Sequence, residues 1–441
     1  MKTKKLTKVE QSIYEHSDKI EEVKKIVQAY SSQSTSENIK EENISDKNWK
    51  NMKFSQPDKI VRLGTLFSGI GAIEHAFQRL NLNHKIVFAG DIDSNCKKSY
   101  FANYKIDEND WFSDIRNFDA SKYKNKVDFI VGGAPCQAFS MVGKRLGFQD
   151  ARGTLFYEFA RVVKETQPKV FLFENVKGLL NHDNGKTWAV IYDIFEELGY
   201  DVHFRVLNSK DYGIPQNRER LYCLGFKKKT DFKFPKPIKL EYKMYDFLED
   251  YIDSKFFLKE KGIKFVTSHK NRKKSYTQIN GDIALCQKRN QEFNWHGDFV
   301  YHPMATKEDP TANFDEFIFD VKDVEEKYYL SEKVAKYVLS SGTKNFKTST
   351  KTDLDIARPL LQSMHKMHRA GVDNYVTHKG RIRKLTPREC LRLMGFKDSF
   401  NIVVSNTSMY QETGNSIVVD VLIAILKQLD ITKYGIEEYD N

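Results

Sequence analysis

The stretch IVRLGTLFSGIGAIEHAFQRLNLNHKIVFAGDID, residues 60–93, decides the fold. An apolar run, VRLGTLFS, leads into glycines and then into IGAIEHAFQRL, whose apolar residues recur at helical spacing, before a second apolar run, HKIVFAG. Strand, turn, helix and strand in this order are typical of a right-handed crossover between parallel strands. The stretch therefore predicts the first unit of a parallel sheet with helices packed on it.

The same alternation continues to residue 226. Four further apolar runs predict strands, namely VDFIVGG, KVFLFENV, HFRVLN and RLYCLGF. Three more stretches carry apolar residues at helical spacing, namely DSNCKKSYFANY, GTLFYEFARVVKETQ and TWAVIYDIFEELGY. The sequence therefore predicts an α/β fold with a doubly wound, mostly parallel sheet that helices cover on both faces.

Residues 1–60 differ from this pattern and are expected to be a separate appendage. Residues 6–30 show apolar positions at alternating spacings of three and four, which predict one helix with a narrow apolar seam. A stretch rich in Ser, Asn, Glu and Lys follows and is expected to be a linker. The helix either packs on its own domain, stays solvated, or contacts a partner or a second copy.

The chain after residue 226 falls into two parts. Residues 227–384 are rich in Lys and aromatic residues and irregular, with one clear helix from Tyr329, and we expect them to form a smaller inserted domain. Residues 385–441 return to helices that complete the sheet domain. Thr386 predicts the N-cap of a helix that starts with Pro387, and a last helix is expected from Ser416 to Leu429.

Charge and composition narrow the class of protein. The 441 residues hold 71 Lys plus Arg against 60 Asp plus Glu, an excess of 11 positive charges. Ten of these belong to residues 227–384, which hold 32 basic and 22 acidic residues, so this segment is expected to meet a polyanion. The five scattered cysteines argue against disulfides and structural zinc, and the lack of a long apolar run predicts a cytoplasmic protein without a membrane helix.

The first strand ends in a glycine turn that is typical of nucleotide sites. In Phe67-Ser68-Gly69-Ile70-Gly71 the two glycines allow the backbone to approach a ligand closely at the start of a helix, although a plain tight turn is the alternative. Asp91 follows about 20 residues later, where a carboxylate can accept hydrogen bonds from ribose. Asp114 closes a further segment and can reach an amino group. Together these residues predict a cofactor that contains a nucleoside.

Two other strand ends carry reactive groups. Cys136 follows VDFIVGGAP, which places a thiol at the carboxyl edge of the sheet, whereas the other four cysteines are expected to be packing residues. Glu174 follows the apolar run VFLF, and a carboxyl group that emerges from a buried strand is a candidate general acid, with an N-cap acid as the alternative. Arg218 and Arg220 offer guanidinium groups for a phosphate or carboxylate, or for surface salt bridges.

Six motifs in order now show a family resemblance. They are Phe67-Ser-Gly-Ile-Gly71, Pro135-Cys136-Gln137, Glu174-Asn175-Val176, Gln216-x-Arg218-x-Arg220, Leu385-Thr-x-Arg388-Glu389 and Gly414-Asn415-Ser416. In order and approximate spacing the chain resembles the DNA (cytosine-5)-methyltransferases of bacterial restriction-modification systems. The resemblance covers about residues 61–226 and 385–441, or half of the chain.

The resemblance implies a catalytic role for five residues. Cys136 would add to carbon 6 of a cytosine flipped out of the duplex, which makes carbon 5 nucleophilic. Glu174 would protonate or hydrogen-bond N3 of the base. Asn175 would fix this geometry, while Arg218 and Arg220 would contact the flipped nucleotide and its phosphate. No metal is required.

The resemblance also implies the cofactor S-adenosylmethionine. The residues it assigns to the cofactor site are Phe67, Gly69, Gly71, Asp91, Ile92, Asp114, Pro135, Asn415 and Ser416. Two positions depart from the family. Asp91 stands where the longer Glu is usual, so its hydrogen bond to ribose has to be rebuilt, and Ile92 replaces a common aromatic residue, which puts stacking on adenine in doubt.

For DNA binding, the resemblance points to a loop and to the insert. The loop after the nucleophile, residues 138–154, resembles a mobile segment that closes over DNA. Residues 227–384 match the target-recognition region of the family. The expected DNA contacts are Gln137, Lys144, Arg145, Arg152, Asn271, Arg272, Arg289, Asn290 and Gln291.

The expected activity is methylation of cytosine in a short duplex sequence, by a monomer on double-stranded DNA. A partner endonuclease is expected if the chain protects host DNA, and none if it is an orphan methylase. Two alternatives remain open: the tRNA-methylating branch of the same family, and a DNA-binding regulator that has lost activity.

Overall fold

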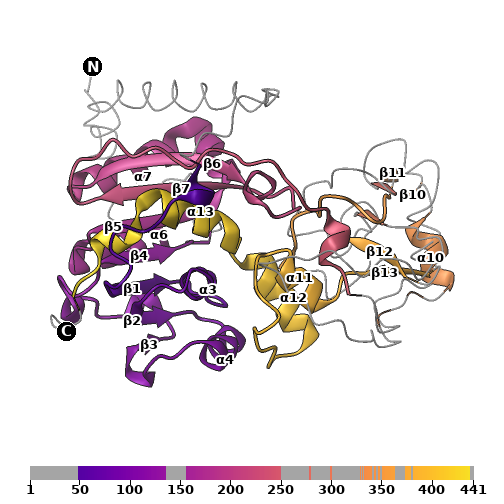
Figure 1. Ribbon diagram of the computed structural model, residues 1–441, viewed down its shortest axis with the longest axis horizontal. Helices are drawn as coiled ribbons and strands as arrows, with labels where there is room; N and C mark the ends of the chain where they lie inside the picture. The colour runs from indigo at the N-terminus through magenta and orange to yellow at the C-terminus, as the bar shows by residue number, and fades with distance from the viewer. Residues whose placement is uncertain are drawn as a thin grey trace, which may run out of the picture.

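A computed structural model describes residues 48–135, 155–249, 350–362, 373–378 and 381–437, with short pieces at 278–279, 298–299, 328, 330, 332–339, 342–343 and 346–347. Figure 1 shows a body built on one large sheet and, beside it, a smaller group of elements. The smaller group holds α10 (Glu332–Val338) and the antiparallel pair β12 (Tyr375–His378) and β13 (Arg381–Lys384). The helix expected over residues 6–30 lies outside the described residues.

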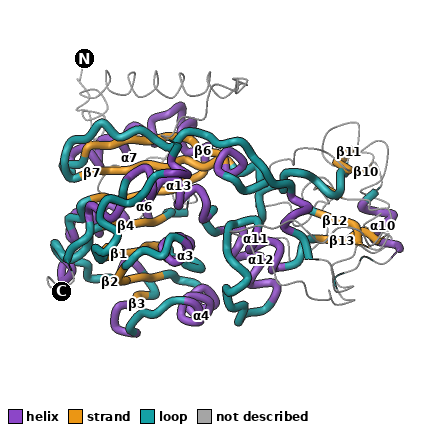
Figure 2. The backbone as a smooth tube through the Cα atoms, in the orientation of Figure 1, coloured by secondary structure: helices purple, strands orange, loops and turns teal. Residues whose placement is uncertain are grey.

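Seven strands form the sheet of the body, in the order β3-β2-β1-β4-β5-β7-β6. Their bounds are β1 (Val61–Leu66), β2 (His84–Gly90), β3 (Trp111–Phe112), β4 (Phe129–Gly132), β5 (Val170–Val176), β6 (Asp201–Asn208) and β7 (Glu219–Phe226). β7 runs antiparallel to β5 and β6, and the other pairs of neighbouring strands in this sheet are parallel. The predicted mostly parallel α/β sheet is confirmed, and Figure 2 shows its strands stacked from β6 and β7 down to β3.

Side chains of successive residues in the central strands point to opposite faces of the sheet, as a period of two requires. Phe129 and Val131 of β4 belong to one apolar cluster with α3 (Ala72–Arg79) and α13 (Val419–Leu429). Ile130 belongs to the other cluster, with α6 (Leu155–Thr166) and α7 (Lys186–Glu197). Both faces of the sheet are therefore covered, which explains why these strands are almost wholly apolar.

The C-terminal segment packs onto the body through three helices. α11 (Pro387–Arg392) starts at the predicted N-cap, where the Thr386 hydroxyl accepts from the N–H of Glu389 and the Glu389 carboxylate accepts from the N–H of Thr386. α12 (Asn406–Asn415) was not expected from the sequence. α13 begins at Val419, three residues later than predicted, and packs on α3.

An ion pair holds α13 to α3 at the end of α11. The guanidinium of Arg79 donates to both oxygens of Asp420, at 2.6 and 3.0 Å, and to the carbonyl of Gly395 at 2.9 Å. Gly395 has a φ of 84°, and a Cβ there would lie 2.2 Å from the Asp420 carboxylate. The pair is nearly buried, so removing one partner would leave an uncompensated charge inside the protein.

Residues 48–60, expected as part of a linker, are packed on the body. The indole N–H of Trp49 donates to the carbonyl of Lys236 at 3.0 Å, and its ring is buried. Ile60 and Ile436 exchange backbone hydrogen bonds of 3.0 and 2.9 Å. Residues 48–60 thus contact the body, which the sequence did not indicate because one buried tryptophan in a polar stretch gives no periodic signal.

The insert begins as an extension of the body. Phe234, Met244 and Phe247 are buried in the same apolar cluster as α3 and α13, before the chain reaches the smaller group. The helix predicted from Tyr329 is confirmed as α10. The remaining described elements are α4 (Ser94–Asn103), β8 (Gln278–Ile279), β9 (Asp298–Phe299), β10 (Gly342–Thr343), β11 (Phe346–Lys347) and the short 3-10 helices at Trp49–Asn51, Glu108–Asp110, Ile115–Asn117, Ser121–Tyr123, Lys177–Gly185, Ser209–Tyr212, Met244–Phe247 and Ile431–Tyr434.

A membrane-spanning helix would need about 20 apolar residues in a row. Of the helices in the described ranges, none is long and apolar enough to cross a membrane.

Candidate active site

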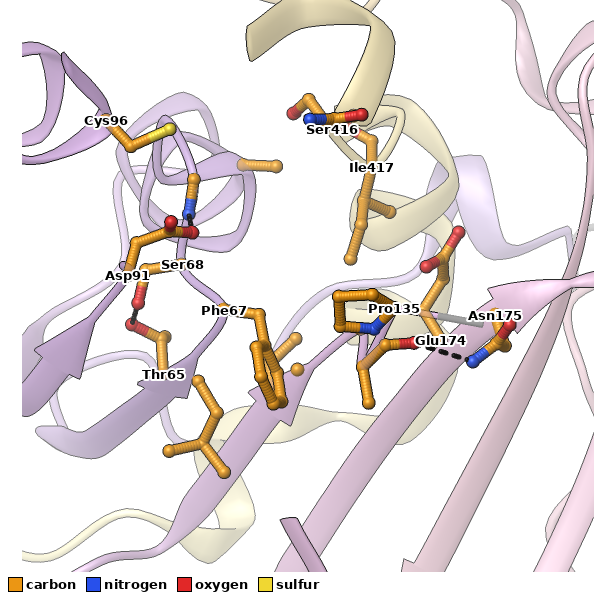
Figure 3. Close-up of a pocket in the computed structure, with 18 of the residues that line it drawn as sticks. Thr65, Phe67, Ser68, Asp91, Cys96, Pro135, Glu174, Asn175, Ser416 and Ile417 are labelled. Atoms are coloured by element: carbon orange, nitrogen blue, oxygen red, sulfur yellow. Dashed lines mark hydrogen bonds between the residues drawn. The ribbon is translucent and has the colours of Figure 1, made fainter. Parts of the chain in front are cut away.

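A cavity of about 1260 Å³ opens at the carboxyl ends of β1, β2, β4 and β5. This edge of the sheet is where open α/β folds bind their ligands. Figure 3 shows Asp91 and Cys96 on one side of the cavity and Pro135, Glu174 and Asn175 on the other. Among the described residues, those that were predicted as site residues and line the cavity are Phe67, Gly69, Asp91, Ile92, Asp114, Pro135, Glu174, Asn175, Arg218, Arg220, Asn415 and Ser416.

Gly71, also predicted as a site residue, has a different position. It precedes α3 with a φ of 75°, and a Cβ there would lie 2.2 Å from the ring of Tyr104. Gly69, with a φ of 52°, has no atom within 4 Å of where its Cβ would stand. Gly71 is therefore required by packing and backbone conformation, whereas Gly69 leaves space open on the cavity side.

Asp91 braces the glycine turn from the end of β2. Its two carboxylate oxygens accept hydrogen bonds from the N–H of Gly69 at 2.9 Å and of Asp93 at 3.0 Å. Burial raises the pKa of Asp91, and these backbone donors oppose that shift. The next residue, Ile92, lines the cavity with 75% of its surface exposed. This end of the cavity therefore offers an acid and an uncovered apolar side chain next to each other.

Asp114 lies near the end of β3 and is already paired. Its carboxylate accepts from Nε and Nη2 of Arg116, at 2.9 and 2.6 Å, and from the N–H of the same residue. The hydrogen bonds from the Arg116 side chain hold the pKa of Asp114 below its usual range. Both side chains line the cavity, so a ligand here would meet an ion pair in which the acid keeps its charge.

At the other end, Asn175 holds the turn that follows β4. Its Nδ2 donates to the carbonyl of Ala134 at 2.9 Å, and its Oδ1 accepts from the N–H of Val176 at 2.9 Å. The side chain is buried, so the two bonds are shielded from water. They fix the backbone immediately before Pro135, whose ring lines the cavity.

Glu174 lies beside the same turn. Burial raises the pKa of Glu174, while the nearby charges of Arg220 and Arg218 pull in the opposite direction. Nε of Arg220 lies 3.4 Å from Oε1 of Glu174. A Cβ at Gly133 would come within 2.8 Å of Oε2, so a glycine there allows the carboxyl group to approach the turn. Burial outweighs the two arginines, so the pKa of Glu174 lies above its ordinary value.

Arg218 faces the backbone of the protein itself. Its guanidinium donates to the carbonyls of Leu360, Gly414 and Ser416, at 3.3, 3.0 and 2.8 Å. These bonds connect Arg218 to the C-terminal segment, and its expected contact with a phosphate stays a prediction. The sequence could not show this, because the carbonyls lie more than 140 residues away along the chain.

Gln216 makes a similar connection and was not among the predicted site residues. Its Nε2 donates to the carbonyl of Leu393 at 2.9 Å, and its Oε1 accepts from the N–H of Leu360 at 2.9 Å. The side chain is fully buried. Gln216 and Arg218 together tie the sheet to the insert and to the C-terminal helices around the cavity.

Sequence reasoning also missed two buried acids that line the cavity, Glu74 and Glu412. Oε1 of Glu74 accepts from the hydroxyl of Tyr100 at 2.6 Å, and Oε2 of Glu412 accepts from the hydroxyl of Ser99 at 2.7 Å. No described residue forms a hydrogen bond with the remaining oxygen of either acid. Burial raises the pKa of both groups to about 7. For Glu74, the sequence contained one indication of a role in the site, namely that this charged residue lies in the helix directly after the glycine turn.

Several predicted residues lie outside the described ranges. They are the nucleophile candidate Cys136 and the expected DNA contacts Gln137, Lys144, Arg145, Arg152, Asn271, Arg272, Arg289, Asn290 and Gln291. Cys96, Cys223 and Cys390 are described as buried free thiols. In the described ranges, no three His, Cys, Asp or Glu side chains are grouped so that they could hold a metal ion.

Comparisons of sequence agree with the geometry. A family model for C-5 cytosine-specific DNA methylase matches residues 61–430. The orphan methyltransferase M.SPRI of Bacillus phage SPR is 33% identical over 434 residues, which cover 84% of this chain and 97% of that protein. The type II methyltransferase M.HpaII of Haemophilus parainfluenzae is also 33% identical, over 82% of this chain and 87% of its own length.

Solved structures show the same fold. The Entamoeba histolytica methyltransferase EhMeth aligns with a TM-score of 0.56 at 17% identity, covering 84% of this chain and 98% of that one. A Spodoptera frugiperda DNMT2 mutant aligns with a TM-score of 0.55 at 20% identity, covering 84% and 99%. At these identities the likeness extends to the fold alone.

Proposed function

Because the chain belongs to the C-5 cytosine-specific DNA methylase family and is a DNA (cytosine-5)-methyltransferase, we propose that its cavity holds S-adenosylmethionine at one end and a flipped cytosine at the other. One observation carries this proposal: a single cavity joins the turn and acids after β1 and β2 to Pro135 after β4, Glu174 near the end of β5 and Arg220 at the start of β7. A cofactor bound at the first end would thus face a base bound at the second.

The described residues fit the cofactor. The cavity exceeds the size of an ordinary ligand pocket, and Gly69 leaves one wall open to a close approach. Ile92 offers an uncovered apolar surface to adenine, and Asp114 a charged acceptor to its amino group. Phe67, Asp91, Pro135, Asn415 and Ser416 complete the proposed binding set. When bound, S-adenosylmethionine supplies an electrophilic methyl group.

The base end supports nucleophilic chemistry at cytosine. Cys136 follows Pro135 in the chain, and we assign its thiolate to carbon 6 of the base. As the sulfur–carbon bond forms, the electrons of the double bond between carbons 5 and 6 make carbon 5 nucleophilic. Glu174 donates its proton to N3 and so stabilises the charge on the ring. Once carbon 5 carries the methyl group, its proton passes to a solvent base, the sulfur–carbon bond breaks to release the thiolate and restore the double bond, and the proton on N3 returns to Glu174.

Three further residues position this chemistry. Asn175 holds the backbone before Pro135 through the carbonyl of Ala134. Arg220, beside Glu174, sets the charge of the carboxyl group and remains our candidate for the flipped nucleotide. For Arg218 we propose a positioning role, because it binds the carbonyls of Gly414 and Ser416 on the two sides of Asn415.

DNA is the proposed partner of the loop and of the insert. Residues 138–154 are proposed to close over the flipped base, with Gln137, Lys144, Arg145 and Arg152 as contacts. Residues 227–384, with their ten excess positive charges, are proposed to read a short duplex sequence as a monomer. Exchanging this segment for that of a relative should change the methylated sequence and keep the chemistry; unchanged specificity would contradict the assignment.

The biological setting remains a proposal. Relatives include both orphan and type II methyltransferases, so a partner endonuclease is one of two proposed settings. A cytoplasmic location, expected from the sequence, stays a prediction. Incorporation of labelled methyl groups into duplex DNA and into tRNA would separate the main proposal from the tRNA-methylating alternative, and bisulfite sequencing would then give the target site.

A covalent trap tests the mechanism directly. In duplex DNA with 5-fluorocytosine at the target position, no proton can leave carbon 5, so the bond to the enzyme cannot break. The wild-type protein with S-adenosylmethionine should give a complex that survives denaturing electrophoresis. Cys136→Ser should give none while it still binds the DNA. A trapped complex with the serine variant would show that another residue is the nucleophile.

A further inference from the structure

Glu412 lines the cavity and has a carboxylate oxygen, Oε1, to which none of the described residues donates a hydrogen bond. The residue lies on α12, two positions before Gly414, and only 3% of its surface is exposed. Oε2 accepts a hydrogen bond from the hydroxyl of Ser99 on α4 at 2.7 Å. Oε1 is buried and has no hydrogen-bond partner in the part of the chain that the structure describes. A buried acceptor without a partner costs free energy, so its persistence at a cavity wall points to a ligand.

The surroundings of Glu412 favour a cation over a neutral donor. The charges of Asp91 and Asp93 act on its carboxylate and oppose its ionisation. The hydrogen bonds of these two acids come from backbone N–H groups, which leave their charge uncompensated by a cation. The cations that line the cavity in the described ranges are Arg116, which pairs with Asp114, and Lys177, Arg218 and Arg220 at the Glu174 end.

S-adenosylmethionine carries one group that suits this position. Its ribose hydroxyls are neutral, and Asp91 already stands at the strand end that suits ribose. Its carboxylate would be repelled by three acids. The ammonium group of its amino acid tail is both a cation and a hydrogen-bond donor.

We propose that Oε1 of Glu412 accepts a hydrogen bond from the α-ammonium group of S-adenosylmethionine, an assignment that rests on the proposed function. Glu412 is then the residue that selects the amino acid tail of the cofactor. Ser99 positions the carboxylate through its hydroxyl. The negative charges of Asp91 and Asp93 oppose ionisation of Glu412 when no ligand is bound. A bound ammonium group would relieve this repulsion, which increases the binding free energy that the contact contributes.

Two natural ligands that differ in the tail allow a direct test. S-adenosylhomocysteine carries the ammonium group, and 5′-methylthioadenosine keeps the nucleoside but lacks the tail. We would measure the Kd of each by calorimetry for the full chain and for Glu412→Gln, which is of equal size and uncharged. We expect Glu412→Gln to weaken S-adenosylhomocysteine at least tenfold and to change the Kd of 5′-methylthioadenosine less than twofold.

Other outcomes overturn the assignment. Equal weakening of both ligands would place the contact at the nucleoside, and no change for either would make Glu412 a packing residue. If the wild-type chain bound neither S-adenosylmethionine nor S-adenosylhomocysteine, the proposed function itself would fail, which is a distinct result.

Two further variants control for charge and folding. Asp93→Asn removes a neighbouring charge but keeps a residue that can cap α4, so it should alter the ratio of the two Kd values less than threefold. A ratio changed as strongly as by Glu412→Gln would mean that general electrostatics, and not a contact, is responsible. If Glu412→Gln does not fold, Ser99→Ala replaces it, because this variant removes only the hydrogen bond that holds the carboxylate. The proposal then requires that Ser99→Ala weakens the binding of S-adenosylhomocysteine and leaves the Kd of 5′-methylthioadenosine unchanged.

Discussion

The two ends of the cavity treat buried carboxyl groups in opposite ways. At the end formed by β2, α4 and α12, Asp91, Asp93 and Glu412 receive hydrogen bonds from backbone N–H groups and a hydroxyl. At the end formed by β5 and β7, Glu174 lies among the charges of Arg220 and Arg218. At the first end the hydrogen bonds to these three carboxyl groups come from uncharged donors. At the second end Glu174 forms an ion pair with Arg220.

This difference matches what each end is proposed to bind. A cationic cofactor would suit the first end, because it would supply a positive charge opposite the carboxylates of Asp91 and Glu412. A neutral base on which negative charge develops suits the second, because Glu174 can pass on a proton while the arginines balance the charge that remains. Variants that act on one end should therefore leave the other intact.

The largest expected effect is that of Glu174→Gln at the base end. Loss of the proton donor should lower kcat by about 10²- to 10⁴-fold, the usual contribution of general acid catalysis. The Kd of S-adenosylhomocysteine should stay within twofold of wild type. Single-turnover methylation of duplex DNA and calorimetry measure the two quantities, and a weakened cofactor would show that the ends are not independent.

Stability should depend on pH through the acids of the cofactor end. The pKa of Glu74 in the folded protein is about 7, against an ordinary value of 4.5, so the folded state binds its proton more tightly than the unfolded state. This contribution is fully present below about pH 4.5, is lost as the pH rises to about 7, and amounts to about 3 kcal/mol. Glu412 adds a loss in the same direction.

The free energy of unfolding, measured with urea between pH 5 and pH 8 without ligand, tests this expectation. Glu74→Gln should be more stable relative to wild type at pH 8 than at pH 5, because it has no carboxyl group to ionise. An identical pH dependence in both proteins would mean that Glu74 ionises as freely inside the protein as in water.

Two glycine variants, one at each end of the cavity, should have smaller effects, one mainly on stability and the other mainly on kcat. Gly71→Ala places a Cβ against the ring of Tyr104 at a φ of 75°, and should lower the free energy of unfolding by about 1–3 kcal/mol. Gly133→Ala meets Oε2 of Glu174 and should lower kcat more than stability. Thermal unfolding and single-turnover rates provide the comparison, and equal losses of stability would contradict it.

The smallest expected effect belongs to Ile92. Its side chain is 75% exposed, so Ile92→Ala should leave stability unchanged within about 0.5 kcal/mol. If adenine covers this side chain, the Kd of S-adenosylhomocysteine should rise about tenfold, since burying part of an Ile contributes about 1–2 kcal/mol. An unchanged Kd would place adenine elsewhere in the cavity.

The sequence predicted the sheet because its signals are local. β1, β2, β4, β5, β6 and β7 each appear as a short apolar run, and α3, α4, α6 and α7 as apolar residues at helical spacing. β3 was not predicted because it has only two residues, too few to form an apolar run. α12 escaped because NTSMYQETGN is largely polar and shows no apolar stripe.

The site was predictable only as far as single strand ends allow. Phe67, Asp91 and Glu174 follow strands whose carboxyl ends must meet at one edge, so their convergence on the cavity could be expected. The roles of Arg218 and Glu412 could not, because each depends on contacts between residues far apart in the chain, such as Ser99 with Glu412.

The backbone contact between Ile60 and Ile436 has a consequence for how the chain is threaded. The first strand of the body starts where the C-terminal helices finish, so the two ends of the catalytic body are neighbours in space. A short peptide joining them, with new termini opened inside the insert, would give a circular permutant that keeps every strand neighbour of the sheet and loses the contact of Trp49 with the body. We therefore expect the fold to tolerate a chain in which the C-terminal helices precede β1 in the sequence.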